Sequence, residues 1–217
     1  MTASHLKRNL FEQLALVSKA MGHAHRLMIL DVLAQGENDV ETLHQKLDLS
    51  IANVSKHLQS LKQAGLVKNR RDKQRIIYRL SDESVFQLIV SLRQVAETQL
   101  DDMQSLLHQH LQPDTPFEPV SLTALKKMTR DNQAYTLLDV RPQDEFDAGH
   151  LPNAINMPIE TLATHLTQFD PQNPLIVYCR GPYCMWSQQA VETLLSQGFN
   201  AKRLIEGYPE WRAQQPH

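Results

Sequence analysis

The chain contains two cysteines, Cys179 and Cys184, five residues apart. The apolar run 175–178 predicts a buried strand and residues 185–195 predict a helix, so Cys179 is expected at a strand-to-helix turn. Unpaired loop amides and the positive end of the helix dipole favour an anion there. A thiol in that position is expected to ionise readily, and a thiolate is the form that attacks sulfur or arsenic. The alternative, that a cysteine is only a small buried hydrophobe, stays open for Cys184.

Several motifs accompany Cys179 in a fixed order. They are LLDVR at 137–141, EFDAGHLPNAIN at 145–156, VYCR at 177–180 and EGYPEW at 206–211. With these motifs, the stretch from about 120 to 213 resembles a rhodanese domain. The resemblance implies that Cys179 carries a sulfane sulfur as a persulfide and that the following loop holds the anion. The loop residues are Arg180, Gly181, Pro182, Tyr183 and Cys184.

Other positions of this resemblance have supporting roles. We expect Arg180 to attract an anionic donor such as thiosulfate. Asp139 and Arg141 are expected to form an ion pair behind the loop, and His150 to be structural. Cys184 stands where thiosulfate-using members often carry a positive residue, and it is placed to attack a persulfide or sulfenic acid on Cys179, which would close an intramolecular disulfide.

Phosphoryl or arsenate chemistry is a weaker alternative for the same loop. The loop is one residue shorter than in the related phosphatases and arsenate reductases. No arginine stands at Met185, where those enzymes would need a cation for the anion.

The composition is that of an ordinary globular protein, with 41% hydrophobic and 21% charged residues among 217. Two cysteines in a chain of this length do not make a secreted disulfide framework. Charged residues interrupt the apolar residues of 1–21, so neither a signal peptide nor a membrane span is expected, and the default location is cytoplasmic. Residues 1–112 carry 14 Lys and Arg against 12 Asp and Glu, whereas 113–217 carry 8 against 12. The two halves therefore favour different partners.

The first half predicts four helices, at 4–21, 23–35, 39–47 and 51–64. A short turn joins the last two, and Ser50 is expected to cap the fourth helix. This arrangement is a helix-turn-helix, whose second helix can enter the major groove of DNA. We expect Val54, Leu58 and Leu61 to point into the core.

Residues 66–80 predict two strands around a polar turn, with six Lys and Arg against one acid. A cationic hairpin next to a helix-turn-helix is typical of a winged helix, whose wing follows the phosphate backbone. The segment SIANVSKHLQSLKQAGLV at 50–67 is similar to the recognition segment of ArsR-type repressors, and the resemblance extends from about 14 to 88. The expected DNA contacts are Asn53, Ser55, Lys56, His57, Gln59, Arg70, Arg71, Lys73 and Arg75.

Residues 82–110 predict one long helix with a continuous apolar stripe. The stripe consists of Val85, Leu88, Ile89, Leu92, Val95, Ala96, Leu100, Met103, Leu106 and Leu107. ArsR-like proteins use such helices as a dimer interface, and a two-fold dimer suits a palindromic operator of double-stranded DNA. The alternative is that the stripe packs within a single chain.

Metal ligands are missing from the positions that metal-sensing relatives use. Asp39 and Glu41 stand where those families place a cysteine pair, and carboxylates disfavour arsenic, cadmium or lead. Val95 and Thr98 stand where a zinc sensor would show histidines. We therefore expect no metal site and no cofactor.

The fold class expected is two domains, a mainly-α winged helix-turn-helix followed by an α/β rhodanese-like domain with a mostly parallel sheet. The boundaries are 1–111 for DNA binding and dimerisation, 112–119 for a proline-rich linker, and 120–217 for the rhodanese-like domain. In the last domain we expect helices at 120–129, 159–166, 185–195 and 209–213, and strands at 136–139, 155, 175–178 and 201–205.

Two classes of function follow. The favoured one is a dimeric DNA-binding regulator whose second half captures sulfane sulfur from thiosulfate, a polysulfide or a persulfide. The other is a sulfurtransferase enzyme that carries its own DNA-binding regulator. In either case substrate is expected at the carboxyl ends of the strands, where Cys179 lies.

Overall fold

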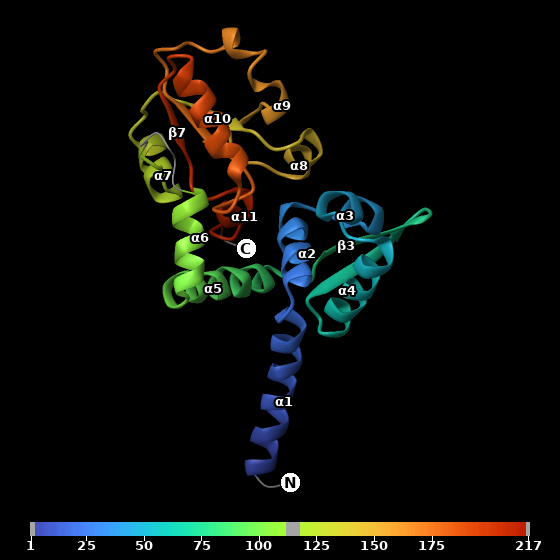
Figure 1. Cartoon of the computed structure of the whole chain (residues 1–217). Coiled ribbons are helices and arrows are strands. Elements are labelled where there is room, and N and C mark those ends of the chain that lie inside the picture. The colour runs from blue at the N-terminus through green and yellow to red at the C-terminus, as the bar shows by residue number, and fades with distance from the viewer. Residues whose placement is uncertain (1–2, 112–117, 216–217) are drawn as a thin grey trace. The chain divides into compact units, whose positions relative to one another are not determined.

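The computed structural model describes residues 3–111 and 118–215, and the chain forms two compact units, residues 1–92 and 93–217 (Figure 1). The boundary between the units falls inside helix α5 (Glu83–Gln99). Of the segment expected to be a linker, all but Glu118 and Pro119 lies outside the described residues. Within the described residues, no helix is long and apolar enough to cross a membrane.

The first unit begins with the four helices expected from the sequence. They are α1 (Ala3–Met21), α2 (Ala24–Gln35), α3 (Val40–Leu47) and α4 (Ile51–Gln63). The side chain of Ser50 caps α4 by accepting a hydrogen bond from the Asn53 N–H at 3.3 Å. Val54, Leu58 and Leu61 are 0% exposed, which confirms the predicted core face of α4.

The predicted wing is also present, with one strand that the sequence did not reveal. The strands β1 (Asn38–Asp39), β2 (Val67–Asp72) and β3 (Arg75–Leu80) form an antiparallel sheet in the order β1-β3-β2. Asn38 pairs with Tyr78 and Asp39 with Ile77. The hairpin is therefore attached to the segment that leads into α3.

The single helix predicted for residues 82–110 is wrong, because the structure has two, α5 and α6 (Asp101–Leu111), with a break at Leu100. At the break, the side-chain amide of Gln104 donates to the carbonyl oxygens of Glu97 and Thr98, at 3.1 and 3.4 Å. This side chain satisfies carbonyls at the end of α5, where a continuous helix would use backbone N–H groups.

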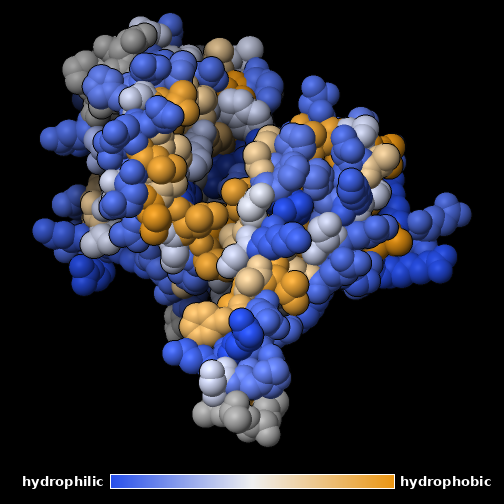
Figure 2. Space-filling view, turned by 60° about the horizontal axis from the view of Figure 1, so that its bottom comes forward, coloured by the Kyte–Doolittle hydropathy of each residue, from blue (hydrophilic) through white to orange (hydrophobic). Residues whose placement is uncertain are grey.

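Large apolar side chains are exposed on α1 and along α5 and α6. They are Leu6, Leu10, Phe11, Leu14, Leu16, Leu88, Leu92, Val95, Leu100 and Leu106. Figure 2 shows apolar side chains in orange on the helix that leads from the grey N-terminal residues. An apolar stripe this exposed within one chain is typical of an interaction surface.

The second unit contains a parallel sheet of four strands in the order β5-β4-β6-β7. The strands are β4 (Thr136–Asp139), β5 (Ile155–Asn156), β6 (Leu175–Tyr178) and β7 (Ala201–Arg203). The helices are α7 (Leu122–Arg130), α8 (Gln143–Ala148), α9 (Ile159–Leu162), α10 (Met185–Ser196) and α11 (Tyr208–Arg212), with a 3₁₀ turn η1 (Leu166–Gln168). The helix predicted at 159–166 is thus shorter, and α8 was not predicted.

Consecutive residues of the central strands point to opposite faces of this sheet. Leu138 and Val177 belong to the core that includes α10, whereas Leu137 and Ile176 belong to the core that includes α7. The expected parallel sheet with helices on both faces is therefore confirmed.

Candidate functional site

Cys179 and Cys184 form a disulfide, with their Cα atoms 6.2 Å apart. Cys179 directly follows β6, and Cys184 is the residue that caps α10, as the predicted strand-to-helix turn required. Cys179 is only 1% exposed, whereas Cys184 is half-buried. Because access helps to decide which sulfur of a disulfide is attacked, an external thiol is expected to attack Cys184. That attack would release the thiolate of Cys179.

The loop between the cysteines is held from behind by Arg203 of β7, a residue that the sequence did not reveal. The Arg203 guanidinium donates to the carbonyl oxygens of Pro182 and Cys184, at 2.7 and 3.3 Å, and to the Ser187 hydroxyl at 3.0 Å. Burial lowers the pKa of Arg203, but an arginine keeps its charge in proteins. Arg203 therefore places a buried positive charge next to the loop. Its only sequence signal is that, of the two adjacent cations in this short strand, Arg203 has the parity that alternates with Lys202, which is half-exposed.

Arg180 was expected to attract an anionic donor, and the structure gives it an anionic partner from the protein itself. Its guanidinium makes two hydrogen bonds to the Glu145 carboxylate, at 2.7 and 2.9 Å, and lies over the Trp186 ring at 4.4 Å. Glu145 is a buried residue of α8. The charge of Arg180 is thus largely offset, so a free cation for thiosulfate is not found here.

The loop amides are only partly available to an anion in this disulfide form. The N–H of Cys184 donates to the Gly181 carbonyl oxygen at 3.1 Å, so that amide is used within the loop. Gly181 has φ of 141°, a conformation that favours glycine. A Cβ on Gly207 would lie 2.7 Å from the Cys179 carbonyl oxygen, so the segment 206–211 packs its backbone directly against the reactive strand end.

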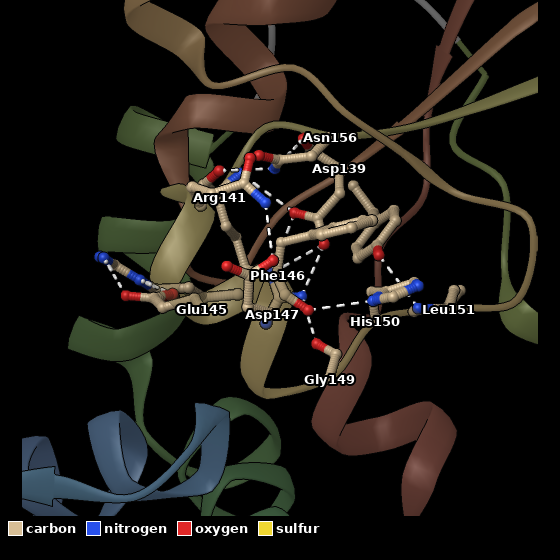
Figure 3. A network of polar contacts seen from close by, with 12 residues as sticks. Asp139, Arg141, Glu145, Phe146, Asp147, Gly149, His150, Leu151 and Asn156 are labelled. Atoms are coloured by element: carbon tan, nitrogen blue, oxygen red, sulfur yellow. Dashed lines mark hydrogen bonds and ion pairs between the residues drawn. The ribbon is translucent and has the colours of Figure 1, made fainter.

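The predicted ion pair of Asp139 and Arg141 is present and fully buried, with both side chains 0% exposed and 2.6 Å between Nη2 and Oδ2 (Figure 3). Arg141 also donates to the Gly149 carbonyl oxygen at 2.8 Å, and Asn156 donates to the carbonyl oxygens of both Asp139 and Arg141. Burial would lower the pKa of Arg141, but the hydrogen bonds and charge of Asp139 outweigh it and raise this pKa. The pair thus ties β4 to the turn at Gly149.

His150 occupies a structural position, as expected. Its ring stacks on Phe146 with 3.8 Å between centroids, and its Nδ1 lies 3.0 Å from the Phe146 carbonyl oxygen. Next to it, the Leu151 N–H donates to the Tyr178 hydroxyl at 3.1 Å. Burial, and then Asp139, raise the pKa of Tyr178, which therefore stays protonated. Figure 3 shows Phe146, His150 and Leu151 close to the ion pair of Asp139 and Arg141.

Two residues of α5 contact the cysteine loop and its neighbour α11. The Tyr183 hydroxyl donates to a Glu97 carboxylate oxygen at 2.7 Å, and Arg93 forms an ion pair with Glu210 at 3.0 Å. Arg93 also lies over the Tyr183 ring, 5.6 Å from its centroid. The Glu210 carboxylate accepts a hydrogen bond from the Gly207 N–H at 3.0 Å. It also lies close to the cysteine loop, because a Cβ added to Gly181 would be 3.2 Å from Oε1 of Glu210. The contacts of Glu97 and Arg93 join positions more than 80 residues apart, so no local pattern predicts them.

Most of the candidate DNA contacts on α4 are placed as expected, with one exception. Asn53, Lys56 and Gln59 are exposed and Ser55 is half-exposed. His57 was expected to face outward, and this is wrong because it is only 9% exposed and its ring lies 4.5 Å from that of His23. Burial, and then His23 and His25, lower the pKa of His57. An uncharged imidazole packs here more easily than a solvated cation would.

The cationic residues of the wing are all exposed, but acids offset only some of them. Arg70 pairs with Glu37 at 2.8 Å and with Asp72 at 3.4 Å, and Arg75 pairs with Asp39 at 3.2 Å. Within the described ranges, Arg71 and Lys73 make no ion pair. These two side chains therefore present unpaired positive charge next to the turn of the hairpin.

Comparisons with known proteins agree with this description. The model of the bacterial regulatory protein arsR family matches residues 24–69, and that of the rhodanese-like domain matches residues 121–214. The chain is 38% identical over 209 residues to the HTH-type transcriptional regulator Rv0324 of Mycobacterium tuberculosis, covering 96% of this chain and 91% of that protein. It is 32% identical over 81 residues to the thiosulfate sulfurtransferase GlpE of Coxiella burnetii, covering 37% of this chain and 74% of the enzyme.

Among solved structures, one similar chain is the homodimeric winged helix-turn-helix DNA-binding domain of Mb0332 from Mycobacterium bovis. It is 40% identical to this chain with a TM-score of 0.42, and the match covers 44% of this chain and 89% of that domain.

Proposed function

Because this chain belongs to the ArsR family of helix-turn-helix transcriptional regulators and carries a rhodanese-like domain, we propose that it is a cytoplasmic, sulfur-responsive repressor. In this proposal it binds a palindromic operator as a homodimer. The sulfur state of Cys179 sets its affinity for DNA.

The chemistry requires only the two cysteines and a sulfane donor. The Cys179 thiolate attacks the outer sulfur of a persulfide donor, which releases the donor thiolate and leaves a persulfide on Cys179. The Cys184 thiolate then attacks the inner sulfur, on Cys179, forming the disulfide and expelling hydrosulfide. The sulfane sulfur is reduced to sulfide while the two thiols are oxidised, so no further oxidant is needed. The disulfide joining these residues is the expected end product.

One observation carries the regulatory part of the proposal, namely that α5 contacts the cysteine loop. Tyr183 lies inside the loop and bonds to Glu97, and Arg93 bonds to Glu210 beside Gly181. The same helix carries the exposed apolar side chains Leu88 and Leu92. A rearrangement of the loop when the disulfide forms or opens would therefore change the contacts of a helix expected to form the dimer interface.

The proposed homodimer rests on the exposed apolar side chains of α1 and α5. Leu10, Phe11 and Leu14 are 57–61% exposed. Three large apolar side chains exposed next to one another are typical of a surface that another protein chain covers. A two-fold dimer would cover both copies of this stripe and present two α4 helices to the half-sites of a palindrome.

The test compares operator binding by the wild type and by Cys179→Ser, each before and after exposure to thiosulfate, polysulfide or a persulfide donor. We expect the donor to change the affinity of the wild type and to leave Cys179→Ser unchanged. Mass spectrometry on the same samples should show loss of two hydrogens in the wild type, and a persulfide in Cys184→Ser. Equal responses by the wild type and Cys179→Ser would remove Cys179 as the sensor.

A second candidate function is a sulfurtransferase that carries its own regulator. The similarity of the second half to a thiosulfate sulfurtransferase favours it, whereas the pairing of Arg180 with Glu145 disfavours fast turnover of thiosulfate. Steady transfer of sulfur to cyanide or a protein thiol by the full chain, with DNA binding indifferent to sulfur, would select this alternative.

A further inference from the structure

Three imidazoles gather where α2 meets α4, in a part of the chain that the sulfur chemistry does not use. His23 precedes α2 and caps it, His25 lies on its first turn, and His57 lies on α4. The ring centroids are 4.5 Å apart for His23 and His57, 5.2 Å for His23 and His25, and 5.6 Å for His25 and His57. One nitrogen from each ring lies within 4.8 Å of the other two.

No acidic partner explains why these basic rings are together. Throughout residues 3–111 and 118–215, no ion pair joins any of the three rings to a carboxylate. In the same residues, the hydrogen bond at their ring nitrogens is the cap that the His25 N–H donates to Nδ1 of His23, at 3.2 Å. The Nε2 atom of His23 and the ring nitrogens of His25 and His57 are left to bind something else.

We propose that His23, His25 and His57 bind one divalent transition-metal ion, with Zn²⁺ as the best match. Neutral imidazole is a preferred ligand of Zn²⁺ and of its neighbours in the first transition series. Three protein ligands leave the fourth tetrahedral position for water or another small ligand. Ligand nitrogens of a tetrahedral Zn²⁺ site are roughly 3.3 Å apart, given Zn–N bonds of about 2.0–2.1 Å. The side chain of His23 is exposed and has room to shift toward the other two, and a shift that released the helix cap would exchange that hydrogen bond for a metal bond.

The ion would connect α2 to the helix expected to enter the DNA groove. Lys56 and Gln59 flank His57 on α4 and face outward. A metal bond from His57 to the start of α2 would fix how α4 lies on the rest of the first unit. The positions at which metal-sensing relatives hold their ions, such as Asp39 and Glu41, lie outside this cluster, and Asp39 instead caps α3.

The experiment uses the full chain carrying Cys179→Ser and Cys184→Ser, so that no thiolate can bind the metal. Titration with Co²⁺ should give the visible absorption bands of a tetrahedral site, saturating at one ion per chain, and Zn²⁺ should abolish them by displacement. Adding His57→Gln should weaken Zn²⁺ binding at least tenfold. His108→Gln with His110→Gln, two exposed histidines on α6, is the matched control and should bind as before.

Circular dichroism shows whether His57→Gln still folds, and if it does not, His25→Gln replaces it as the deciding variant. Loss of binding in the folded cluster variant and not in the control supports the site. Zn²⁺ binding that is unchanged by the cluster variant, or lost equally in the control, would overturn it. Neither result bears on the sulfur chemistry, because both cysteines are absent from every protein compared.

Discussion

The hydroxyl of Tyr183, in the loop between the two cysteines, donates a 2.7 Å hydrogen bond to the carboxylate of Glu97 on α5. Helix α5 runs without a break from Glu83 to Gln99. Glu97, which contacts the loop, therefore belongs to the same helix as the exposed side chains of Leu88 and Leu92. If the loop signals through this contact, removing it should separate sulfur chemistry from DNA binding.

The variant Tyr183→Phe tests that separation. It should form the disulfide as fast as the wild type, since the ring is kept, while the donor-induced change in operator affinity should shrink. Loss of one hydrogen bond at a partly exposed site is worth about 1 kcal/mol, or roughly fivefold in affinity. Tyr135→Phe, which removes a hydroxyl that bonds to Thr129 of α7 and not to the cysteine loop, should respond fully. A full response by Tyr183→Phe would mean that the loop acts through another contact.

Replacing Arg203 should weaken the cysteine loop. In Arg203→Met, the carbonyl oxygens of Pro182 and Cys184 lose their buried donor, which should lower the free energy of unfolding by about 1–3 kcal/mol. Urea denaturation measures this directly. The neighbouring Lys202→Met removes an exposed cation and should change the stability by much less. Equal losses of unfolding free energy in the two variants would show that the hydrogen bonds of Arg203 to the loop do not stabilise the protein.

The salt dependence of operator binding should reveal which wing residues contact phosphates. Each phosphate contact that is lost reduces the slope of log K against log salt by about 0.9. Arg71→Gln and Lys73→Gln should each reduce the slope by about this amount. Arg70→Gln should reduce it less, because Glu37 and Asp72 already pair with Arg70. A larger effect from Arg70 than from Arg71 would reverse this assignment.

Asp39 should make the stability of the protein depend on pH at the acidic end. The Asp39 carboxylate accepts a hydrogen bond from the Thr42 N–H at 2.8 Å. This hydrogen bond is the main cause that lowers the pKa of Asp39 in the folded chain. Because the folded pKa lies below the unfolded one, this stabilisation is complete above the unfolded pKa of about 3.9 and is lost as pH falls through the folded pKa.

Asp39→Asn keeps a capping side chain but removes the charge. It should be less stable than the wild type at pH 7, by about 0.3–1 kcal/mol, and the difference should vanish at the lowest pH. Thermal unfolding of both proteins between pH 2 and pH 7 measures this. A difference that is constant over that range would mean that the Asp39 charge contributes nothing.

Local patterns were sufficient for much of this fold. The turn chemistry of Ser50 predicted the capped start of α4, and its side chain accepts the expected N–H. The apolar run before Cys179 predicted β6, because a strand buried on both faces carries few polar residues. The ion pair of Asp139 and Arg141 was predicted from the rhodanese resemblance, and the structure contains it.

What the sequence did not reveal depends on contacts between distant residues. The burial of His57 depends on His23, 34 positions earlier, and that of Arg203 depends on loop carbonyls about 20 positions away. At the break near Leu100, the Gln104 side chain donates to the carbonyl oxygens of Glu97 and Thr98. The apolar stripe in the sequence carries no information about these hydrogen bonds. Helix α8 is short and acidic on its surface, so its one buried carboxylate, Glu145, gave no periodic signal.

The short strand β1 has a consequence for how such a regulator can be controlled. Since Asn38 and Asp39 pair with β3, the wing hairpin and the start of α3 are joined by backbone hydrogen bonds and cannot easily pivot independently. A sulfur signal then has little to adjust between the wing and α3 of one chain. In the proposed dimer it would act on the separation and mutual tilt of the two winged helices, and operators whose half-site spacing is lengthened or shortened by one base pair should respond to it most strongly.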